Sequence, residues 1–240
     1  MTKLYEAKNH ILIHAEGAEP TEHRHMAAHI IVSLEGSMKV LRDGAEYLCG
    51  GVIIPAGVSH AVKTEGNAVL VFLYDCTTDV ARQIKVMHLL SEACCNEISM
   101  LYAELERSGN YDRFEKGVLR QVGMTDTGCG IMDERIRSAM QYIRTRLPER
   151  ISCGEVADGV HLSQGRFSHL FREQVGMTFA SYLIYQRIMY VYAEVLRGRT
   201  ITDAALDAGF SSSSHFADIN RRVFGLSASG ITRDLIFCKV

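Results

Sequence analysis

The chain has 240 residues, of which 47% are apolar and 22% are charged, and this length and composition allow two compact domains. No apolar run approaches 18 residues and the N-terminus lacks the apolar core of a signal peptide, so we expect neither a membrane span nor a secretory leader. Residues 1–130 hold 12 Lys and Arg against 17 Asp and Glu, a net charge of −5, whereas residues 131–240 hold 14 against 11, a net charge of +3. The second half is therefore the one that can attract an anionic partner.

Residues 1–78 contain short runs rich in β-branched residues, with turn signals between them. Glu35-Gly36, Asp43-Gly44 and Pro55-Ala56-Gly57 fall where tight turns are needed. This pattern predicts a small antiparallel β-barrel. The expected strands are 11–13, 29–34, 37–41, 52–54 and 69–74.

Four histidines fall within this predicted barrel. His23 and His25 alternate along one strand and so share a face, and His60 returns on a neighbouring strand towards the same interior. Together with His29 they resemble the ligand positions of the cupin fold, although His29 stands where cupins usually have Glu. The resemblance implies a divalent transition metal, which could be Zn, Ni, Cu or Fe. The alternative is a barrel without metal, whose histidines hydrogen-bond a ligand.

Inward side chains of the same strands would line any pocket for a small-molecule effector. We expect the apolar part of that lining to come from Ile31, Val40 and Phe72.

Residues 79–130 have a helical pattern. Ile98, Leu101, Tyr102 and Leu105 lie at i, i+3, i+4 and i+7, which makes one apolar stripe that needs a partner surface. Packing of this stripe against the chain's own barrel is one way to bury it. Residues 123–130 then read as a flexible linker because four of the eight are Gly or Asp.

The last hundred residues contain two stretches that each read as helix, tight turn, helix. In the first, a short helix over 151–159 is followed by a turn and by Ser163, which caps a helix with Phe167, Leu170 and Phe171 on one face. In the second, Thr202 is the expected N-cap, Gly209 ends the helix and 212–214 offer new caps. Both have the form of a helix-turn-helix, whose second helix can enter a major groove of DNA.

Residues 131–233 resemble the double helix-turn-helix domain of the AraC family of bacterial transcription regulators. The matching elements are 163–172, 176–179, Arg187, 201–216 and 224–227. The resemblance implies that both recognition helices contact DNA, and that one helix of region 79–130 pairs with its copy in a second subunit through Ile98, Leu101, Tyr102 and Leu105. The implied DNA-facing residues are Gly165, Arg166, Ser168, His169 and Arg172 in the first unit, and Ser213, Ser214, Ala217, Asp218 and Arg221 in the second.

Five positions depart from the family pattern. Asp218 replaces a basic or amide residue, and a carboxylate facing phosphates is repelled unless it accepts from a cytosine amine. Asn220 replaces a core Phe, Ala228 replaces Pro, and 231–232 replace Tyr-Arg. The first unit is therefore expected to read DNA, and the second to be weaker or mainly structural.

These observations predict an α+β protein of several domains. The expected order is a cupin-like barrel over 1–78, a helical dimerisation and linker region over 79–130, and an all-α double helix-turn-helix over 131–240. The expected function is a transcription regulator whose barrel senses a small molecule or a metal. The alternative is a cupin metalloenzyme resembling a small-molecule dioxygenase, with an appended helical domain.

The partners expected for a regulator are double-stranded promoter DNA, the effector, a second copy of the chain and RNA polymerase. Seven cysteines form no CxxC pair, and their odd number suits reduced thiols in the cytoplasm.

Overall fold

The computed structural model describes residues 2–7, 10–17, 20–24, 27–76, 78–125, 133–224 and 235–239. The chain forms two compact units. Unit 1 consists of Met1–Gly128 and Arg221–Val240, and unit 2 of Cys129–Asn220. Two segments that the sequence analysis used lie outside the described residues. Residues 126–130 belong to the predicted linker, and residues 225–234 include the departures from the family at Ala228 and 231–232.

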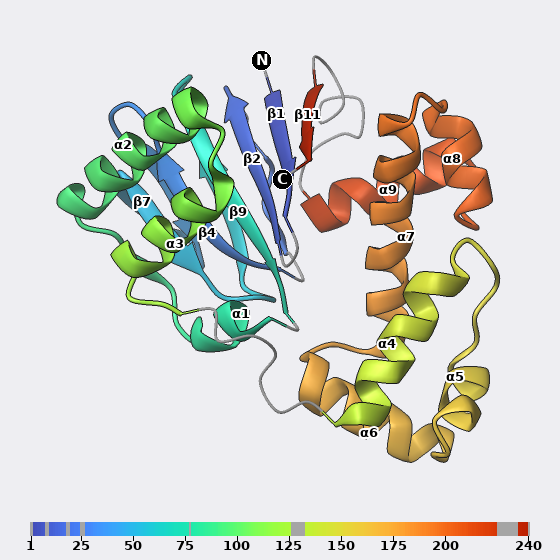
Figure 1. Ribbon diagram of the computed structural model, residues 1–240. Coiled ribbons are helices and arrows are strands. Elements are labelled where there is room, and N and C mark those ends of the chain that lie inside the picture. The colour runs from blue at the N-terminus through green and yellow to red at the C-terminus, as the bar shows by residue number, and fades with distance from the viewer. Residues whose placement is uncertain are drawn as a thin grey trace. The chain divides into compact units, whose positions relative to one another are not determined.

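Unit 1 is built on two β-sheets, in line with the predicted cupin-like fold (Figure 1). Pairing between neighbouring strands is antiparallel except for one parallel pair at the sheet edge. The larger sheet has the order β10 (His88–Leu89), β7 (Gly51–Ile54), β4 (Ala27–Ser33), β9 (Ala68–Asp75), β2 (His10–Glu16), β1 (Thr2–Glu6) and β11 (Leu235–Lys239). The smaller sheet has the order β3 (His23–Arg24), β8 (Ser59–Lys63), β5 (Met38–Arg42) and β6 (Ala45–Cys49).

The predicted hairpin turn at Asp43-Gly44 is confirmed. Both residues have positive φ, 51° and 77°, which is the backbone form of a two-residue type I′ turn. The strands on either side pair from Arg42 with Ala45 to Met38 with Cys49. Gly44 adopts this φ without strain, and Asp is one of the residues that tolerates it.

The larger sheet is buried on both faces, and this divides unit 1 into two cores. All seven residues of β4 are buried. Ala28, Ile30 and Val32 belong to an outer core under the helices, whereas Ile31 belongs to an inner core between the two sheets. The alternation of a strand thus sends successive side chains into different cores.

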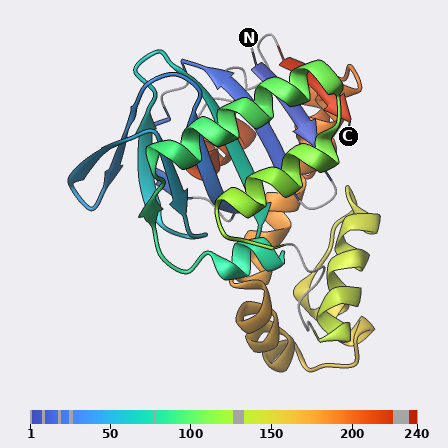
Figure 2. The same cartoon turned by 60° about the vertical axis from the view of Figure 1, so that its left-hand side comes forward.

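Helices α1 (Asp79–Gln83), α2 (Glu92–Ser108) and α3 (Tyr111–Gln121) cover the outer face of the larger sheet (Figures 1 and 2). The predicted dimerisation stripe lies on α2, but Ile98, Tyr102 and Leu105 are buried in the outer core. Leu101 is half-buried and turns towards α3, where a Cβ at Gly117 would lie 2.8 Å from its Cδ1. The stripe thus packs against the chain's own sheet and α3, which is the alternative that the sequence left open, and its contact with a second subunit stays a prediction.

Strand β11 was not expected. It pairs in parallel with β1, from Thr2 with Leu235 to Glu6 with Lys239. The last residues of the chain therefore belong to the sheet of unit 1, although the predicted boundaries assigned all of 131–240 to the DNA-binding domain. Similarly, 79–125 pack into the core of unit 1 and do not form a separate region.

Unit 2 is helical and contains the two predicted helix-turn-helix units. The helices are α4 (Glu134–Arg146), α5 (Cys153–Gly159), α6 (Gln164–Val175), α7 (Phe179–Leu196), α8 (Ile201–Asp207) and α9 (Ser213–Phe224), of which α9 continues beyond Asn220. Hydroxyl caps begin α5 to α8, and the cap of α8 is Thr200, whose Oγ1 accepts from the Asp203 N–H at 3.1 Å. The expected cap, Thr202, lies inside the helix. Across the described residues, no helix is long and apolar enough to span a membrane.

A buried polar pair joins α7 to α9. Asn220 is fully buried, and the Tyr192 hydroxyl donates to its Oδ1 at 2.6 Å. Phe216, one turn earlier on α9, packs edge-on against the same Tyr192 ring, with centroids 6.2 Å apart. Asn220 stands where the family usually has a core Phe. Its amide oxygen can be buried there because Tyr192 of the neighbouring helix donates a hydrogen bond to it.

Replacing Tyr192 by Phe should destabilise unit 2, because it removes the donor to a buried amide oxygen and leaves the ring packing in place. We expect a loss of about 1–3 kcal/mol in the free energy of unfolding, measured by urea denaturation. Tyr190→Phe is the matched control, since Tyr190 is a half-buried tyrosine on the same helix. Equal losses in the two variants would show that the Tyr192 hydroxyl does not stabilise the fold.

Candidate DNA-binding surface and histidine cluster

The first helix-turn-helix is formed by α5 and α6. The turn between them places His161 at φ 57°, and Ser163 caps α6 by accepting from the Arg166 N–H at 3.3 Å. Phe167 and Phe171 are fully buried and pack edge-on against Phe179 of α7. This aromatic contact fixes which side of α6 faces solvent.

The exposed side of α6 contains every residue of the first helix-turn-helix that the family resemblance implied would face DNA. They are Gly165, Arg166, Ser168, His169 and Arg172, all exposed. Helix α6 thus packs through its apolar face and exposes a polar, basic face to solvent.

The second helix-turn-helix is formed by α8 and α9. Ser212 Oγ accepts from the His215 N–H at 3.0 Å at the start of α9, and Phe216 is fully buried. The implied DNA-facing residues differ in exposure: Ser214, Asp218 and Arg221 are exposed, whereas Ser213 and Ala217 are half-buried. On the inner face of α9, Phe216 and Asn220 are buried, whereas Ile219 and Val223 are half-buried.

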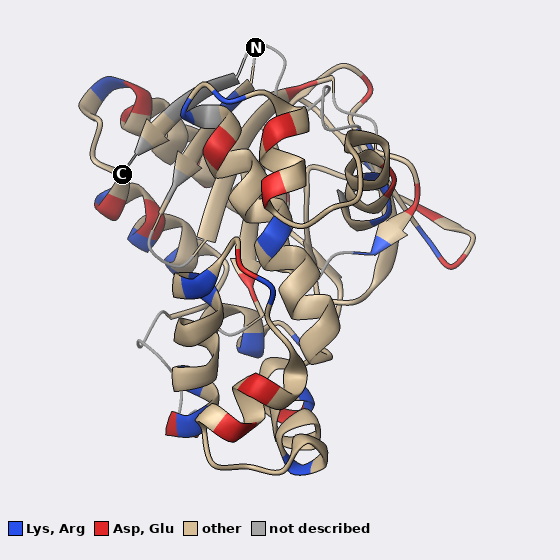
Figure 3. Ribbon diagram, turned by 90° about the vertical axis from the view of Figure 1, so that its right-hand side faces the viewer, with Lys and Arg blue, Asp and Glu red and all other residues tan. Residues whose placement is uncertain are grey.

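The arginines of the helical half, blue with the lysines in Figure 3, differ in their acidic neighbours, and two sets of them matter for DNA binding. One group is neutralised by acidic neighbours and consists of Arg135, Arg137, Arg146, Arg197 and Arg199. Within the part of the chain that the structure describes, Arg166 and Arg172 of α6 take part in no ion pair, and neither do Arg221 and Arg222 of α9. Exposed guanidinium groups without a carboxylate partner can bind phosphate without first breaking an ion pair.

The two recognition helices differ in their acidic residues. On α6, Glu173 follows Arg172 in the chain, and its carboxylate lies 3.9 Å from Nε2 of His169. On α9, the exposed Asp218 lies one turn before Arg221 and Arg222. Each helix thus has two arginines and one acidic residue, but only in α9 does the acidic residue stand at one of the implied DNA-facing positions.

Three of the four predicted histidines meet inside unit 1. His23 on β3 is the register partner of His60 on β8, and their ring centroids are 4.7 Å apart. His29 on β4 lies edge-on to His60 at 5.2 Å. All three are buried, and they come from both sheets. The fourth, His25, lies outside the described residues.

Burial lowers the pKa of each of these imidazoles, that of His60 to about 4. Nδ1 of His23 lies 2.6 Å from the Thr21 carbonyl oxygen, and Nδ1 of His60 lies 2.9 Å from that of Val58. A carbonyl oxygen only accepts, so both rings donate from Nδ1 and carry the neutral ring's lone pair on Nε2. Metal-binding histidines are commonly oriented in this way.

The arrangement of these side chains is not by itself a metal centre. Among the described residues, no three His, Cys, Asp or Glu side chains are grouped so that they could hold a metal ion. The donor chemistry of His23 and His60 suits a metal, but the described geometry does not complete a coordination site.

Of the three residues expected to line a pocket in the barrel, two face its interior, and their contact with a ligand stays a prediction. Ile31 and Val40 lie in the inner core, next to which the histidines gather. Phe72 lies on the opposite face of the sheet and stacks on Phe114 of α3, with centroids 5.8 Å apart. Its expected inward orientation was wrong because β9 faces helices on one side and the barrel on the other, and hydrophobicity does not distinguish the two faces.

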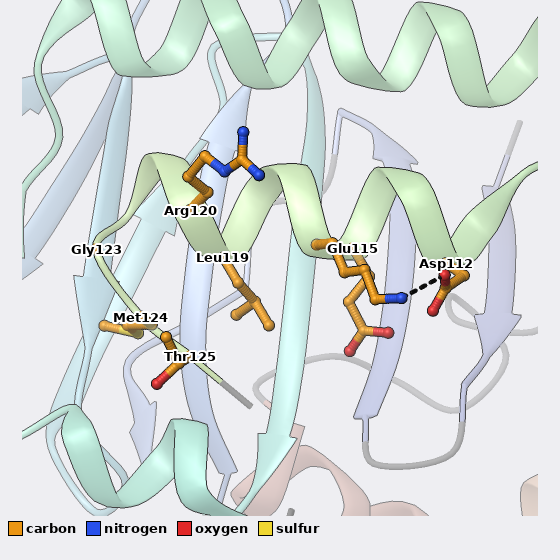
Figure 4. Close-up of a pocket in the computed structure, with 8 residues that line it drawn as sticks. Asp112, Glu115, Leu119, Arg120, Gly123, Met124 and Thr125 are labelled. Atoms are coloured by element: carbon orange, nitrogen blue, oxygen red, sulfur yellow. Dashed lines mark hydrogen bonds and ion pairs between the residues drawn. The ribbon is translucent and has the colours of Figure 1, made fainter. Parts of the chain in front are cut away.

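A groove of about 530 Å³ lies along α3, outside the barrel (Figure 4). Its polar lining is of mixed charge, with Lys116 paired to Asp112 at 2.7 Å and Glu115 near His10 at 3.3 Å. The remaining lining residues are Leu119, Arg120, Gly123, Met124 and Thr125. With its principal charges already paired, the groove favours no particular ligand class.

The chain is similar to known transcription regulators. A model described as a helix-turn-helix domain matches residues 156–234. The probable transcriptional regulator LumQ of Photobacterium leiognathi is 27% identical over 86% of this chain and 90% of its own length. The arabinose operon regulatory protein of Escherichia coli is 35% identical over 102 residues, which are 41% of this chain and 34% of that protein.

Among solved structures, ToxT from Vibrio cholerae has the same fold. It aligns with a TM-score of 0.61 at 12% identity, covering 92% of this chain and 97% of that one. A structure of ToxT with bound unsaturated fatty acid aligns with a TM-score of 0.58, also at 12% identity, over 93% and 94% of the two chains.

These matches are to a helix-turn-helix domain and to transcription regulators, and so they favour the regulator over the alternative of a cupin metalloenzyme. The two helix-turn-helix units, one of them with an exposed basic recognition face, agree with them. The chain is thus similar to helix-turn-helix transcription regulators, among them the arabinose operon regulatory protein.

Proposed function

We propose that this regulator binds promoter DNA mainly through α6, and that α9 binds DNA more weakly. The observation that carries the proposal is the contrast between the implied DNA-facing positions of the two helices: those of α6 include exposed Arg166 and Arg172 and no acidic residue, whereas those of α9 include exposed Asp218. Phosphate neutralisation supplies much of the affinity of a protein for DNA, so an exposed carboxylate at a reading head lowers it.

The N-terminal barrel is the proposed sensor. Its inner core is closely filled by apolar side chains, and the polar end consists of the three buried imidazoles. We propose that the effector, a small molecule or a metal ion, binds at these histidines. Two facts support this: the rings come from both sheets, so one ligand would join them, and burial keeps the rings neutral.

Effector binding regulates DNA affinity only if the effector prefers one of two states of the protein. A ligand that joins β3 and β8 to β4 would favour the state in which the two sheets are closed together. The same proposal includes a second copy of the chain and RNA polymerase as protein partners at the promoter.

Replacing Arg172 by Ala should weaken DNA binding and reduce its dependence on salt. If Arg172 contacts a phosphate, the slope of log affinity against log salt should fall in magnitude by about 0.9. The measurement is fluorescence anisotropy with duplex DNA from upstream of the protein's own gene and with a scrambled duplex. Arg146→Ala is the matched control, because Arg146 is exposed on α4 and paired with Glu149 at 2.6 Å. Equal effects of the two substitutions would contradict the assignment of α6.

Replacing Asp218 by Arg should tighten DNA binding and steepen the salt slope, because repulsion of a phosphate is replaced by attraction. The same anisotropy titration measures both quantities. Asp218→Asn separates the two causes, since it removes the repulsion without adding a charge. An affinity that neither substitution changes would show that position 218 does not approach DNA.

A metal effector should raise the melting temperature of the full chain, because a ligand that binds only the folded state stabilises it. We would titrate Zn²⁺ and Ni²⁺ into chelator-treated protein and follow thermal unfolding and DNA anisotropy. His60→Ala should abolish the shift, whereas His88→Ala should retain it, because His88 is exposed on β10. A shift that survives His60→Ala, or no shift with either ion, would exclude metal as the effector at this cluster.

A further inference from the structure

Strand β6 forms an open edge of the smaller sheet. Within the described part of the chain its only strand partner is β5. Its residues 45–48 are all exposed, and two of them are large and apolar: Tyr47 is 38% exposed and Leu48 is 66% exposed. Figure 2 shows the hairpin of β5 and β6, in blue, projecting from the rest of unit 1.

The inner core of unit 1 continues to this edge and is uncovered there. Tyr47 is the register partner of Val40, which is fully buried in the inner core, and Cys49 on the same face of β6 is also buried in it. Tyr47 therefore extends the apolar inner face one strand beyond the covered region. Glu46 and Leu48 lie on the outer face.

The type I′ turn fixes which backbone groups of β6 point outward. A two-residue turn closes on a hydrogen-bonded pair, here Arg42 and Ala45, and hydrogen-bonded pairs alternate with pairs that are not. The N–H and C=O groups of Ala45, Tyr47 and Cys49 thus point towards β5. Those of Glu46 and Leu48 point away from the sheet, where they can pair with another strand.

We infer that β6 is a homodimer interface, in which it pairs antiparallel with β6 of a second copy about a two-fold axis at Tyr47. This register places the outward backbone groups of Glu46 opposite those of Leu48 of the second copy, so both sets of hydrogen bonds can form. In this register all five residues of β6 have a partner in the second copy. A register centred on Glu46 would place two carboxylates opposite each other, which is unfavourable.

A second copy fits this edge better than an unrelated strand does. The sequence of the strand is self-complementary in the register centred on Tyr47, because its one charged residue meets an apolar residue and two tyrosine rings meet at the centre. The inference rests on the homodimer of the proposed function and gives it a surface other than the stripe of α2, which is buried.

The test is sedimentation equilibrium of the full chain and of two variants at one position. Leu48→Glu would place a carboxylate opposite Glu46 of the second copy, twice per dimer, whereas Leu48→Lys would place an ammonium there. Both lose the same apolar contact, so the difference reports the register. We expect the dimer dissociation constant of Leu48→Glu to exceed that of Leu48→Lys by about tenfold.

Met100→Glu is the matched control, since Met100 is 57% exposed on the outer face of α2 in the same unit. It should leave the dimer unchanged. A dimer that resists both Leu48 substitutions, or one that both weaken equally, would overturn the proposed interface. A wild-type chain that stays monomeric would overturn the homodimer as well, while DNA anisotropy on the same samples reports separately whether the reading heads still bind.

Discussion

The larger sheet of unit 1 is apolar on both faces, and the need to bury both faces determines most of what surrounds it. Helices α2 and α3 cover one face, and the smaller sheet covers the other. The alternation along β4 then sends Ile30 to the helices and Ile31 to the barrel interior. His29 lies on the barrel side of the same strand, where it meets His60 of the opposite sheet.

This constraint also decides which surfaces remain for partners. The apolar stripe of α2 covers the sheet of its own chain, with Ile98, Tyr102 and Leu105 buried there. Among the residues that the structure describes, the smaller sheet has four strands against seven in the larger one, and its last strand, β6, leaves apolar surface exposed. An edge strand with free backbone groups and exposed Tyr47 and Leu48 is the kind of surface that proteins usually pair or protect.

In unit 2 the distribution of ion pairs determines which arginines remain available to a partner. Acidic residues neutralise the arginines that lie away from the recognition helices, so the net positive charge is concentrated at α6 and at the end of α9. Two helix-turn-helix units of the same form thus differ in electrostatics. In the second helix-turn-helix, the hydrogen bond between Tyr192 and Asn220 lets an amide occupy the core at the position where the family usually has Phe.

The sequence by itself determined the features that depend on local pattern. The Asp43-Gly44 turn, the cap at Ser163 and the aromatic stripe of α6 follow from residues close together in the chain, and a helix period or a turn type can be recognised within such a window. For the same reason the exposed face of α6 could be predicted residue by residue. The spacing of the histidines likewise predicted that His23 and His60 would meet.

The tertiary structure decided everything that depends on which two surfaces meet. Phe72 was assigned to the wrong face of its strand, and the partner of the α2 stripe stayed open, because an apolar side chain indicates burial without saying against what. The pairing of β11 with β1 joins residues at opposite ends of the chain, and no local pattern encodes such a contact. The open edge at β6 exists only because of the order of strands in the sheet, which side-chain alternation within a single strand does not specify.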